Sequence, residues 1–235
     1  MIILGEQFPN GYFWLISNSR SGHNFIKNNI ESWFDKTRMY WNLEQFSPKA
    51  FNNHETLEGL PAKLYDSSLK VVCTRDLLNW FTSCSFMGDK FKDSWKGPWT
   101  IKEGLEWRTR NWIEIAKETL GITNYIKDSI GVYYDDFVSS EKYRKNICDK
   151  LGGEYNEKML NIIPQEGNHS TFDGAEFQNR AQEMKVLERY KVWENKEDKK
   201  LLRILKNSEA LDFYLKHFDV DNDKMKFIEK WIMSK

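Results

Sequence analysis

The sequence has no excess of charge of either sign: its 35 Lys and Arg residues are matched by 35 Asp and Glu, so the net charge is zero. Such a balance argues against bulk binding of nucleic acid or of an anionic membrane, but it leaves room for a local basic pocket. No apolar run approaches the ~20 residues that a membrane helix requires, and the mean hydropathy is −0.70. We therefore expect neither nucleic acid nor a membrane as a partner.

Cysteine is also scarce. Cys73, Cys84 and Cys148 lie at no spacing typical of metal ligands, and their odd number indicates thiols outside disulfides in a reducing compartment. The first residues, MIILGEQFPNGYF, have no basic segment before their short apolar start, which indicates that no signal peptide is present. These features predict a cytoplasmic protein and suggest no metal ion.

Short apolar runs alternate with amphipathic segments from residue 13 onward. Runs such as LKVVCT are typical of buried parallel strands, and apolar residues at helical spacing are typical of helices that pack on a sheet. The predicted strands are residues 13–17, 38–43, 69–74 and 129–137. The predicted helices are the segment after the 18–22 turn and residues 57–65, 77–87, 101–120, 141–151 and most of 178–235.

This alternation predicts an α/β fold of three layers, in which a central parallel β-sheet is flanked by helices. No internal repeat and no long linker interrupts the pattern, so we expect a single domain over residues 1–235.

The turn at residues 18–22 has the chemistry of an anion cradle. Gly22 would let the backbone approach a ligand closely, and the helix that follows points backbone N–H groups and the positive end of its dipole at the turn. Arg20 adds a full charge and a planar fork of donors. The nucleotide-hydrolase version of such a loop has Lys-Ser or Lys-Thr after the last glycine, whereas His23 and Asn24 stand here. An ordinary strand-to-helix turn is the alternative reading.

A second strand–turn–helix segment, KVVCTRDLLNWFTSCSF, places Arg75 at the end of a strand and Ser83 eight residues later on a helix. Tyr134 precedes two acidic residues in VYYDDF, and a later loop contains Ser170-Thr171-Phe172. The ordinary readings are a surface salt bridge from Arg75 to Asp76, a back-bonded helix hydroxyl at Ser83 and a buried strand tyrosine at Tyr134.

Taken together over roughly residues 12–191, these segments resemble the sulfotransferases. Arg20, Ser21, Gly22 and Phe25 keep the pattern of the family's 5′-phosphosulfate loop, while His23 and Asn24 replace its two hydroxyl residues. The resemblance implies a P-loop-like sulfotransferase fold and the donor 3′-phosphoadenosine 5′-phosphosulfate (PAPS), with no metal required. The residues that it implies for the donor are Arg20, Ser21, Gly22, His23, Asn24 and Phe25 in the loop, Arg75, Ser83 and Arg189 at the 3′-phosphate, and Tyr134, Ser170 and Phe172 at the adenosine.

The resemblance leaves several of these roles open. Arg189 is one of four late basic residues, with Arg180, Lys185 and Lys191, and their register does not single it out. His23 could donate to the sulfonate or only cap the helix.

The resemblance also implies a general base that takes a proton from the acceptor. The family's cytosolic members have a His about twenty residues before the 3′-phosphate Arg, and His54 lies 21 residues before Arg75. Glu55 is the rival, because carbohydrate-acting members use a Glu. The family's Lys two residues before that His is replaced by Asn52. Arg20 would stabilise charge on the bridging oxygen during in-line transfer.

We expect the acceptor to be a small molecule or a carbohydrate, and the sequence leaves its identity and the oligomeric state open. The Trp-rich segment 91–112 is a candidate for a lid or for a wall of the acceptor site, although a core role is the plainer reading of its aromatic residues. A P-loop kinase and a non-catalytic nucleotide-binding relative are the alternatives. The first lacks its Lys-Ser or Lys-Thr, and the second is kept open by the unusual residues His23, Asn24 and Asn52.

Overall fold

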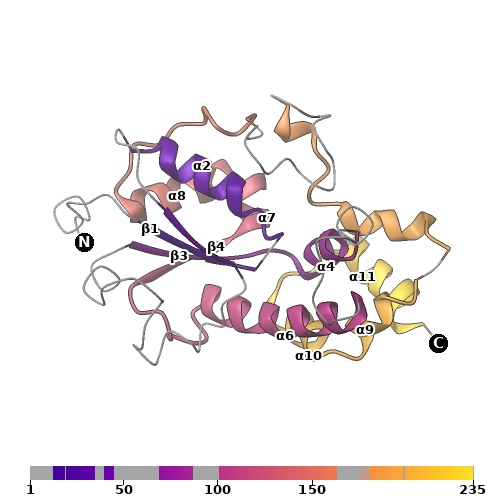
Figure 1. Cartoon of the computed structure of the whole chain (residues 1–235). Coiled ribbons are helices and arrows are strands. Elements are labelled where there is room, and N and C mark those ends of the chain that lie inside the picture. The colour runs from indigo at the N-terminus through magenta and orange to yellow at the C-terminus, as the bar shows by residue number, and fades with distance from the viewer. Residues whose placement is uncertain are drawn as a thin grey trace. The chain divides into compact units, whose positions relative to one another are not determined.

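The computed structural model, shown in Figure 1, describes residues 13–18, 20–34, 40–44, 69–86, 101–162, 177, 180–197 and 199–234. The chain divides into two compact units, and each is discontinuous in sequence. Unit 1 contains Met1–Arg75 and Glu114–Met184, and unit 2 contains Asp76–Ile113 and Lys185–Lys235. The expectation of a single domain over the whole chain stays a prediction.

Unit 1 is built on a four-stranded sheet with the order β2-β1-β3-β4, in which all neighbouring strands are parallel. The register pairs Ser17 with Cys73 and Thr74 with Tyr133, so the carboxyl ends of three strands lie together at one edge. A parallel sheet flanked by helices confirms the predicted α/β class. The strands are β1 (Phe13–Ser17), β2 (Tyr40–Glu44), β3 (Leu69–Thr74) and β4 (Ser129–Tyr133).

The strands form because their apolar runs are buried on both faces of the sheet. Leu15 and Val71 on one face, and Ile16 and Val72 on the other, are all fully buried. Continuous β-branched and leucine-rich runs of this kind are typical of parallel strands covered by helices.

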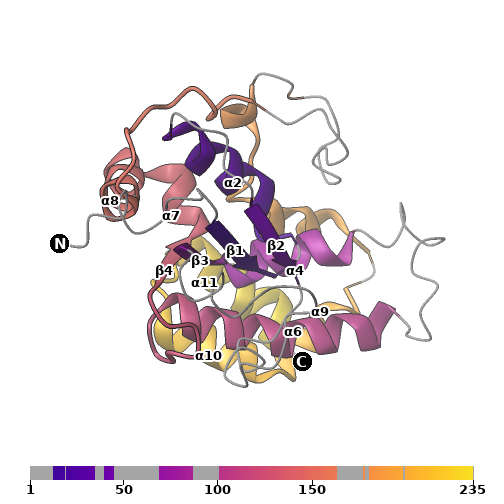
Figure 2. The ribbon, with the colours of Figure 1, turned by 60° about the vertical axis from the view of Figure 1, so that its left-hand side comes forward.

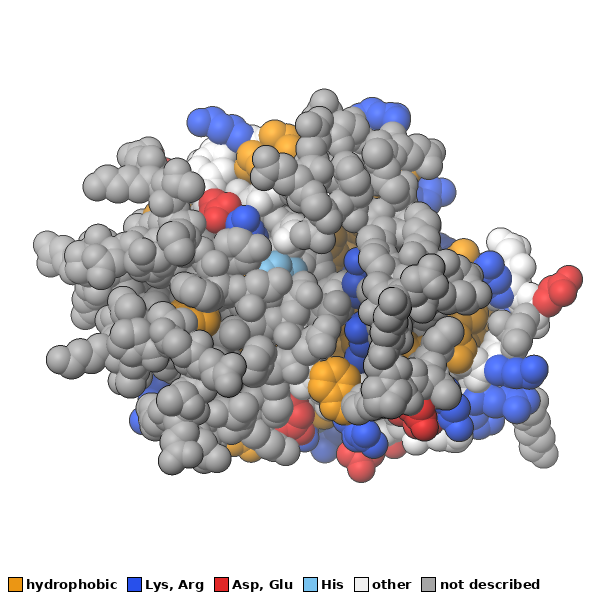
Figure 3. Space-filling model, in the orientation of Figure 1, with side chains coloured by type: hydrophobic (Ala, Val, Ile, Leu, Met, Phe, Trp, Pro, Cys, Tyr) orange, Lys and Arg blue, Asp and Glu red, His pale blue; other side chains and the backbone are white. Residues whose placement is uncertain are grey.

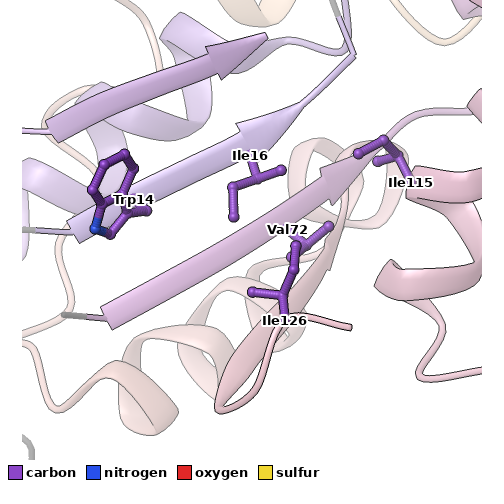
Figure 4. Packing of buried hydrophobic residues seen from close by; sticks show 5 residues of the cluster. All are labelled: Trp14, Ile16, Val72, Ile115 and Ile126. Atoms are coloured by element: carbon purple, nitrogen blue, oxygen red, sulfur yellow. The ribbon is translucent and has the colours of Figure 1, made fainter. Parts of the chain in front are cut away.

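One face of the sheet packs against the C-terminal part of helix α6 (Ile101–Thr119) and the segment that follows it. Trp14, Ile16 and Val72 form a buried cluster with Ile115 of α6 and Ile126, as Figure 4 shows. The other face is covered by α2 (His23–Ser32), α7 (Tyr134–Ser139) and α8 (Glu141–Leu151), which lie together on the opposite side of the strands in Figures 1 and 2.

Two predicted boundaries need correction. The strand predicted to reach Phe137 ends at Tyr133, and α7 begins at Tyr134. Asp135 and Asp136 fall in the first turn of α7, where carboxylates stabilise the positive end of the helix dipole, so a helix competes successfully with the strand there. The helix predicted over 77–87 ends at Ser85. By contrast, α8 ends at Leu151 as predicted, and Gly152 follows as its C-cap with a φ of 70°.

Unit 2 is helical, as the charged C-terminal part of the sequence predicts. Its aromatic core includes Trp80 and Trp112, both fully buried, with ring centroids 6.4 Å apart. The helices that lie within it are α4 (Leu77–Ser85), the first part of α6, the 3-10 helix η3 (Arg189–Asn195), α9 (Leu202–Lys206), α10 (Glu209–His217), α11 (Asn222–Phe227) and the π-helix η4 (Ile228–Met233). A further 3-10 helix, η2 (Ala181–Glu183), belongs to unit 1.

Asp76 ties three helices of unit 2 together. One carboxylate oxygen accepts the Asn79 amide at the start of α4, at 2.9 Å, and the other accepts from the Tyr214 hydroxyl and from Lys224 Nζ at 3.0 Å. Asp76 is fully buried, so its charge is compensated by these partners rather than by water. The interpretation of Arg75 and Asp76 as a surface salt bridge is therefore wrong.

The surface and the cysteines agree with the composition. On the face shown in Figure 3, Lys and Arg side chains lie interspersed with Asp and Glu, as a chain of zero net charge allows. Cys73, Cys84 and Cys148 are all buried and none forms a disulfide. Among the described helices, none combines the length and the apolar character needed to cross a membrane.

Candidate functional site

The sheet order places a topological switch point between β1 and β3. From β1 the chain adds β2 on one side, then returns to add β3 on the other side, so the connections leave the carboxyl ends of β1 and β3 in opposite directions. In open parallel α/β sheets, ligands bind outside the carboxyl ends of the strands at such a point. The residues there are the 18–22 turn after β1 and Arg75 after β3.

The turn has an unusual backbone. Arg20 and Gly22 both adopt positive φ, at 73° and 81°, and the Ser21 amide donates to the Asn18 carbonyl at 3.1 Å. A positive φ costs a residue with a Cβ roughly 1–2 kcal/mol, so Arg20 is held in place by its surroundings. Gly22 is the N-cap of α2, and no described side chain caps this helix. The amides of the first helical turn, starting at His23, have no acceptor within the helix and present its positive end.

Arg75 joins the end of β3 to this turn. Its Nη1 donates to the Arg20 carbonyl at 3.3 Å, and its guanidinium carbon lies 4.9 Å from the centre of the Tyr134 ring. The side chain is only 1% exposed. The Cys73 thiol, two residues earlier, donates weakly to the Ser21 carbonyl at 3.6 Å. Two side chains at the end of β3 thus donate to backbone carbonyls of the turn that follows β1.

Tyr134 explains why position 22 is glycine. A Cβ added to Gly22 would lie 1.9 Å from Cε2 of the Tyr134 ring, so the ring occupies the space beside this residue. Phe25 packs edge-on against the same ring at 6.1 Å. Gly22 therefore permits the positive φ and accommodates Tyr134, while its role in letting the backbone approach a ligand stays a prediction.

His23 points into the protein. Its Nδ1 is hydrogen-bonded to the Ser17 hydroxyl at 3.0 Å, and the residue is 4% exposed. Burial, and secondarily the charge of Lys27, lower the pKa of His23 to about 3, so the imidazole is neutral near pH 7. It does not cap α2, which corrects one of the two roles expected for it.

Two buried hydroxyls lie at the same edge of the sheet. Ser21 Oγ and Thr74 Oγ1 belong to fully buried residues, and neither atom has a hydrogen-bond partner among the described residues. A buried polar atom left without a partner costs about 1–3 kcal/mol. Thr74 was missed by the sequence analysis, although its place as the last residue of β3, directly before Arg75, would have indicated it.

Cys73 is also buried at this edge, but it is not suited to act as a nucleophile. Burial and the nearby Asp135 carboxylate raise its pKa, and the opposing effect of Arg75 is smaller. The thiol therefore stays protonated, and a thiol is a much weaker nucleophile than a thiolate.

Within unit 2, the structure brings together Ser83 and Arg189, two residues that the resemblance implies for the 3′-phosphate. Arg189 Nη1 donates to Ser83 Oγ at 3.1 Å, and the Ser83 hydroxyl donates to the Asn79 carbonyl at 2.9 Å, so the back-bonded reading of this serine is confirmed as well. Asn79, which sequence reasoning missed, holds the start of η3 and the segment before it: its side chain donates to the Leu187 carbonyl and accepts from the Tyr190 amide.

The other late basic residues differ from Arg189. Arg180 pairs with Glu183 at 2.8 Å and Lys191 pairs with Glu188 at 3.1 Å, both as neighbours in sequence near the surface. Lys185 is exposed. Of the four candidates, only Arg189 donates to Ser83 among the described contacts.

Several predicted residues lie outside the described part of the chain. These are the two candidates for the general base, His54 and Glu55, and the two adenosine residues, Ser170 and Phe172. Trp112 lies within the described part, but it is fully buried in the aromatic core of unit 2, so it forms no wall of an acceptor site. Among the described residues, no cluster of His, Cys, Asp and Glu is arranged to hold a metal ion.

Comparison of the chain with protein-family models, with curated proteins and with solved structures finds no match.

Replacing Gly22 by Ala should destabilise unit 1 through two effects, the positive φ and the clash with Tyr134. Gly121 provides the matched control, because it has a φ of 69° but no atom within 4 Å of an added Cβ. We expect Gly121→Ala to lower the free energy of unfolding by about 1–2 kcal/mol and Gly22→Ala by a further ~1–3 kcal/mol from overpacking. Urea denaturation of both variants measures the difference. Equal losses would show that Tyr134 does not fill the space beside Gly22.

The buried His23 should make the protein less stable in mild acid. Its folded-state pKa is about 3, below the ordinary 6.5, so the unfolded chain takes up a proton first as the pH falls. The free energy of unfolding is therefore unaffected by His23 well above pH 6.5, and it falls as the pH drops from 6.5 toward 3. Between pH 7.5 and 5.5 the loss is about 1.4 kcal/mol.

His23→Gln should remove this part of the pH dependence, as measured by thermal unfolding at both pH values. The Asn24→Ala variant, changed at the neighbouring residue without loss of a titrating group, should keep it. An unchanged slope in His23→Gln would contradict the burial of a neutral imidazole.

Proposed function

We propose that the protein is a sulfotransferase that moves the sulfuryl group of PAPS to a hydroxyl or amine of a small-molecule or carbohydrate acceptor. The observation that carries the proposal is the contact of Arg75 with the Arg20 carbonyl at the switch point of the sheet, 3.3 Å long. It places a buried cation beside the turn that precedes an uncapped helix N-terminus. In this proposal the fold is a three-layer, P-loop-like sulfotransferase fold and the protein is cytoplasmic.

The 18–22 turn suits the 5′-phosphosulfate end of the donor. Helix amides and the dipole of α2 favour an anion there, and the Arg20 side chain adds a full charge. The buried Ser21 hydroxyl, without a partner among the described residues, shows that the turn has hydrogen-bonding capacity that its own side chains leave unused. Asn24 and Phe25 complete the loop in the first turn of α2.

The 3′-phosphate is assigned to Arg75, Ser83 and Arg189. Arg75 supports this assignment within unit 1 because a buried guanidinium has a large desolvation cost that an anion would offset. Within unit 2, the Arg189–Ser83 hydrogen bond supports the assignment because it already holds the Arg189 guanidinium beside Ser83. Tyr134, with Ser170 and Phe172, is assigned to the adenosine.

When bound, PAPS supplies an activated sulfuryl group whose transfer leaves a nucleotide bisphosphate. The chain's part is to hold that group still and to offset charge on the bridging oxygen, which we assign to Arg20 and the first amides of α2. A base must accept the proton of the acceptor, and His54 is our first choice with Glu55 as the rival. His23 is neutral and its Nδ1 is hydrogen-bonded to Ser17, so we do not assign it as the base; its predicted role as a donor to the sulfonate stays a prediction.

A P-loop kinase and a non-catalytic nucleotide-binding relative are the competing functions. Against the kinase, position 23 holds a histidine whose ring turns inward, where that family needs a lysine that reaches the phosphates. The non-catalytic relative is separated from the enzyme by turnover with a panel of acceptors.

The product nucleotide, 3′-phosphoadenosine 5′-phosphate, should stabilise the protein without added metal. At a hundredfold excess over its dissociation constant, the gain is about 2.7 kcal/mol. For a chain of this size, that gain raises the melting temperature by roughly 5–10 °C. Removing the 3′-phosphate, as in adenosine 5′-phosphate, should weaken binding. The ratio of the two dissociation constants therefore measures recognition of the 3′-phosphate.

Arg189→Gln should reduce this ratio roughly tenfold, since it removes a charged donor assigned to the 3′-phosphate. Ser83→Ala should reduce it less, since it removes the hydroxyl that holds Arg189. Arg180→Gln, which removes an exposed arginine paired with Glu183, is the control and should leave the ratio unchanged. Arg75→Ala should reduce the ratio as well. If that variant does not fold, Arg75→Lys, which keeps a charge but loses the planar fork of donors, takes its place. Equal melting shifts with both nucleotides, or a strict Mg²⁺ requirement, would favour the kinase.

His54→Ala should separate catalysis from donor binding. A general base that contacts only the acceptor leaves the nucleotide-induced melting shift intact, while transfer falls by ~10²–10⁴. Glu55→Gln should have the smaller effect, and the opposite order would exchange the two roles. Full activity of His54→Ala toward a confirmed acceptor between about pH 6 and 8, where a histidine titrates, would remove His54 from the mechanism.

A further inference from the structure

Unit 2 contains a cavity of about 620 Å³ that shares no residue with the site described above. One wall is formed by the first part of α6, and the other by the segment from Lys200 to Glu209, which includes α9 and the start of α10. Cavities of about 300–1,000 Å³ are the usual size of sites for small organic molecules. The volume is therefore that of a site for an organic molecule rather than for a single inorganic ion.

The cavity wall has more cations than anions. Lys102 and Arg110 come from α6, and Lys200 and Arg203 come from the opposite wall, against Glu106 and Glu209. Glu106 already pairs with Lys102 at 3.7 Å.

The two arginines differ from Lys102 in having no carboxylate of their own. Neither the Arg110 nor the Arg203 side chain forms an ion pair or hydrogen bond with any described residue. Two guanidinium groups on facing walls are thus available to a ligand, and each offers a planar fork of donors that matches an oxyanion.

The start of α10 adds to this positive potential. Ser208 holds the N-cap position, but its hydroxyl donates to the Leu205 carbonyl at 2.8 Å, and no described side chain caps the helix. Asn207, Ser208 and Glu209 line the cavity, so the first amides of α10 lie at its wall. The helix has nine residues, which is long enough for its dipole to favour an anion at this end.

The remaining lining residues are aliphatic or use their polar atoms elsewhere. Ile113 and Ile204 are 6% and 7% exposed, and Leu201 lies beside them in the lining. The Thr109 hydroxyl donates to the Leu105 carbonyl of its own helix, at 2.7 Å. The cavity therefore combines cationic groups with an apolar surface, and it suits a ligand that has both an oxyanion and a hydrocarbon body.

We propose that this cavity is a second ligand site, which binds a small organic anion with an apolar body. The oxyanion is held by Arg110 and Arg203 near the start of α10, and the apolar body lies against Ile113, Leu201 and Ile204. The proposal does not depend on sulfotransferase activity, because its residues and those of the switch-point site are different.

Naphthalene-1-sulfonate is a suitable probe, since it has both parts and its sulfonate is not transferable. Isothermal titration should show binding to one site. The matched naphthalene-1-sulfonamide, which is neutral, and inorganic sulfate, which has no apolar body, should each bind at least about tenfold more weakly. Arg110→Gln and Arg203→Gln should each weaken binding of the sulfonate about tenfold. Leu201→Asn should weaken binding of the sulfonate but not of sulfate.

Two control variants locate the site. Lys216→Gln removes an exposed cation of α10 outside the cavity, and Arg20→Gln removes one from the turn of unit 1; both should bind the sulfonate like the parent protein. Excess 3′-phosphoadenosine 5′-phosphate should not displace the probe. The proposal is overturned if the folded parent protein does not bind the sulfonate, if the folded Arg110→Gln/Arg203→Gln double variant binds it like the parent, or if Arg20→Gln abolishes binding.

Discussion

Burial of the Arg75 guanidinium is the constraint on which the geometry of the switch-point site depends. A cation removed from water costs several kcal/mol unless dipoles or anions replace its hydration. The Arg20 carbonyl and the face of the Tyr134 ring supply part of that replacement. Arg20 adopts a positive φ beside this contact, and the ring occupies the space that a side chain at position 22 would need. The strained residue, the glycine and the buried charge therefore meet at one place, the carboxyl ends of β1 and β3.

A second consequence concerns which groups remain available for chemistry. His23, which was expected at the donor site, and the Cys73 thiol are both buried. Burial keeps His23 neutral and Cys73 protonated. This edge of the sheet instead provides positive potential from the helix amides and Arg20, and hydrogen-bonding capacity from two buried hydroxyls. None of these groups accepts a proton readily near pH 7. Such an edge is suited to binding and orienting an anion, so a proton acceptor has to come from another segment.

The sequence predicted the elements well where local pattern decides, and less well where packing decides. β1, β3, α6 and α8 follow directly from apolar periodicity and from helix stops at glycine. The end of β4 was misplaced because a strand and a helix adjoin without a turn residue at Tyr134. The inward rotation of His23 could not be predicted, because its partner Ser17 is on the preceding strand and only the turn geometry brings them together. The hydrogen bond between Ser83 and Arg189 was not predicted, since 106 residues separate them and the family resemblance left the register of the late basic residues open.

The two compact units escaped sequence analysis for a physical reason. Their boundaries fall between Arg75 and Asp76, inside α6 and after Met184, where no stretch of Gly, Ser or Pro marks a linker. At the first boundary, two oppositely charged neighbours contact residues of different units: Arg75 contacts Arg20 and Tyr134, and Asp76 contacts Asn79, Tyr214 and Lys224. Adjacent charges in a sequence are usually read as a pair, but here each has its own set of buried partners. The chain therefore passes from the sheet of unit 1 to the helices of unit 2 at one peptide bond, and the sequence marks that point with two buried charges rather than with a linker.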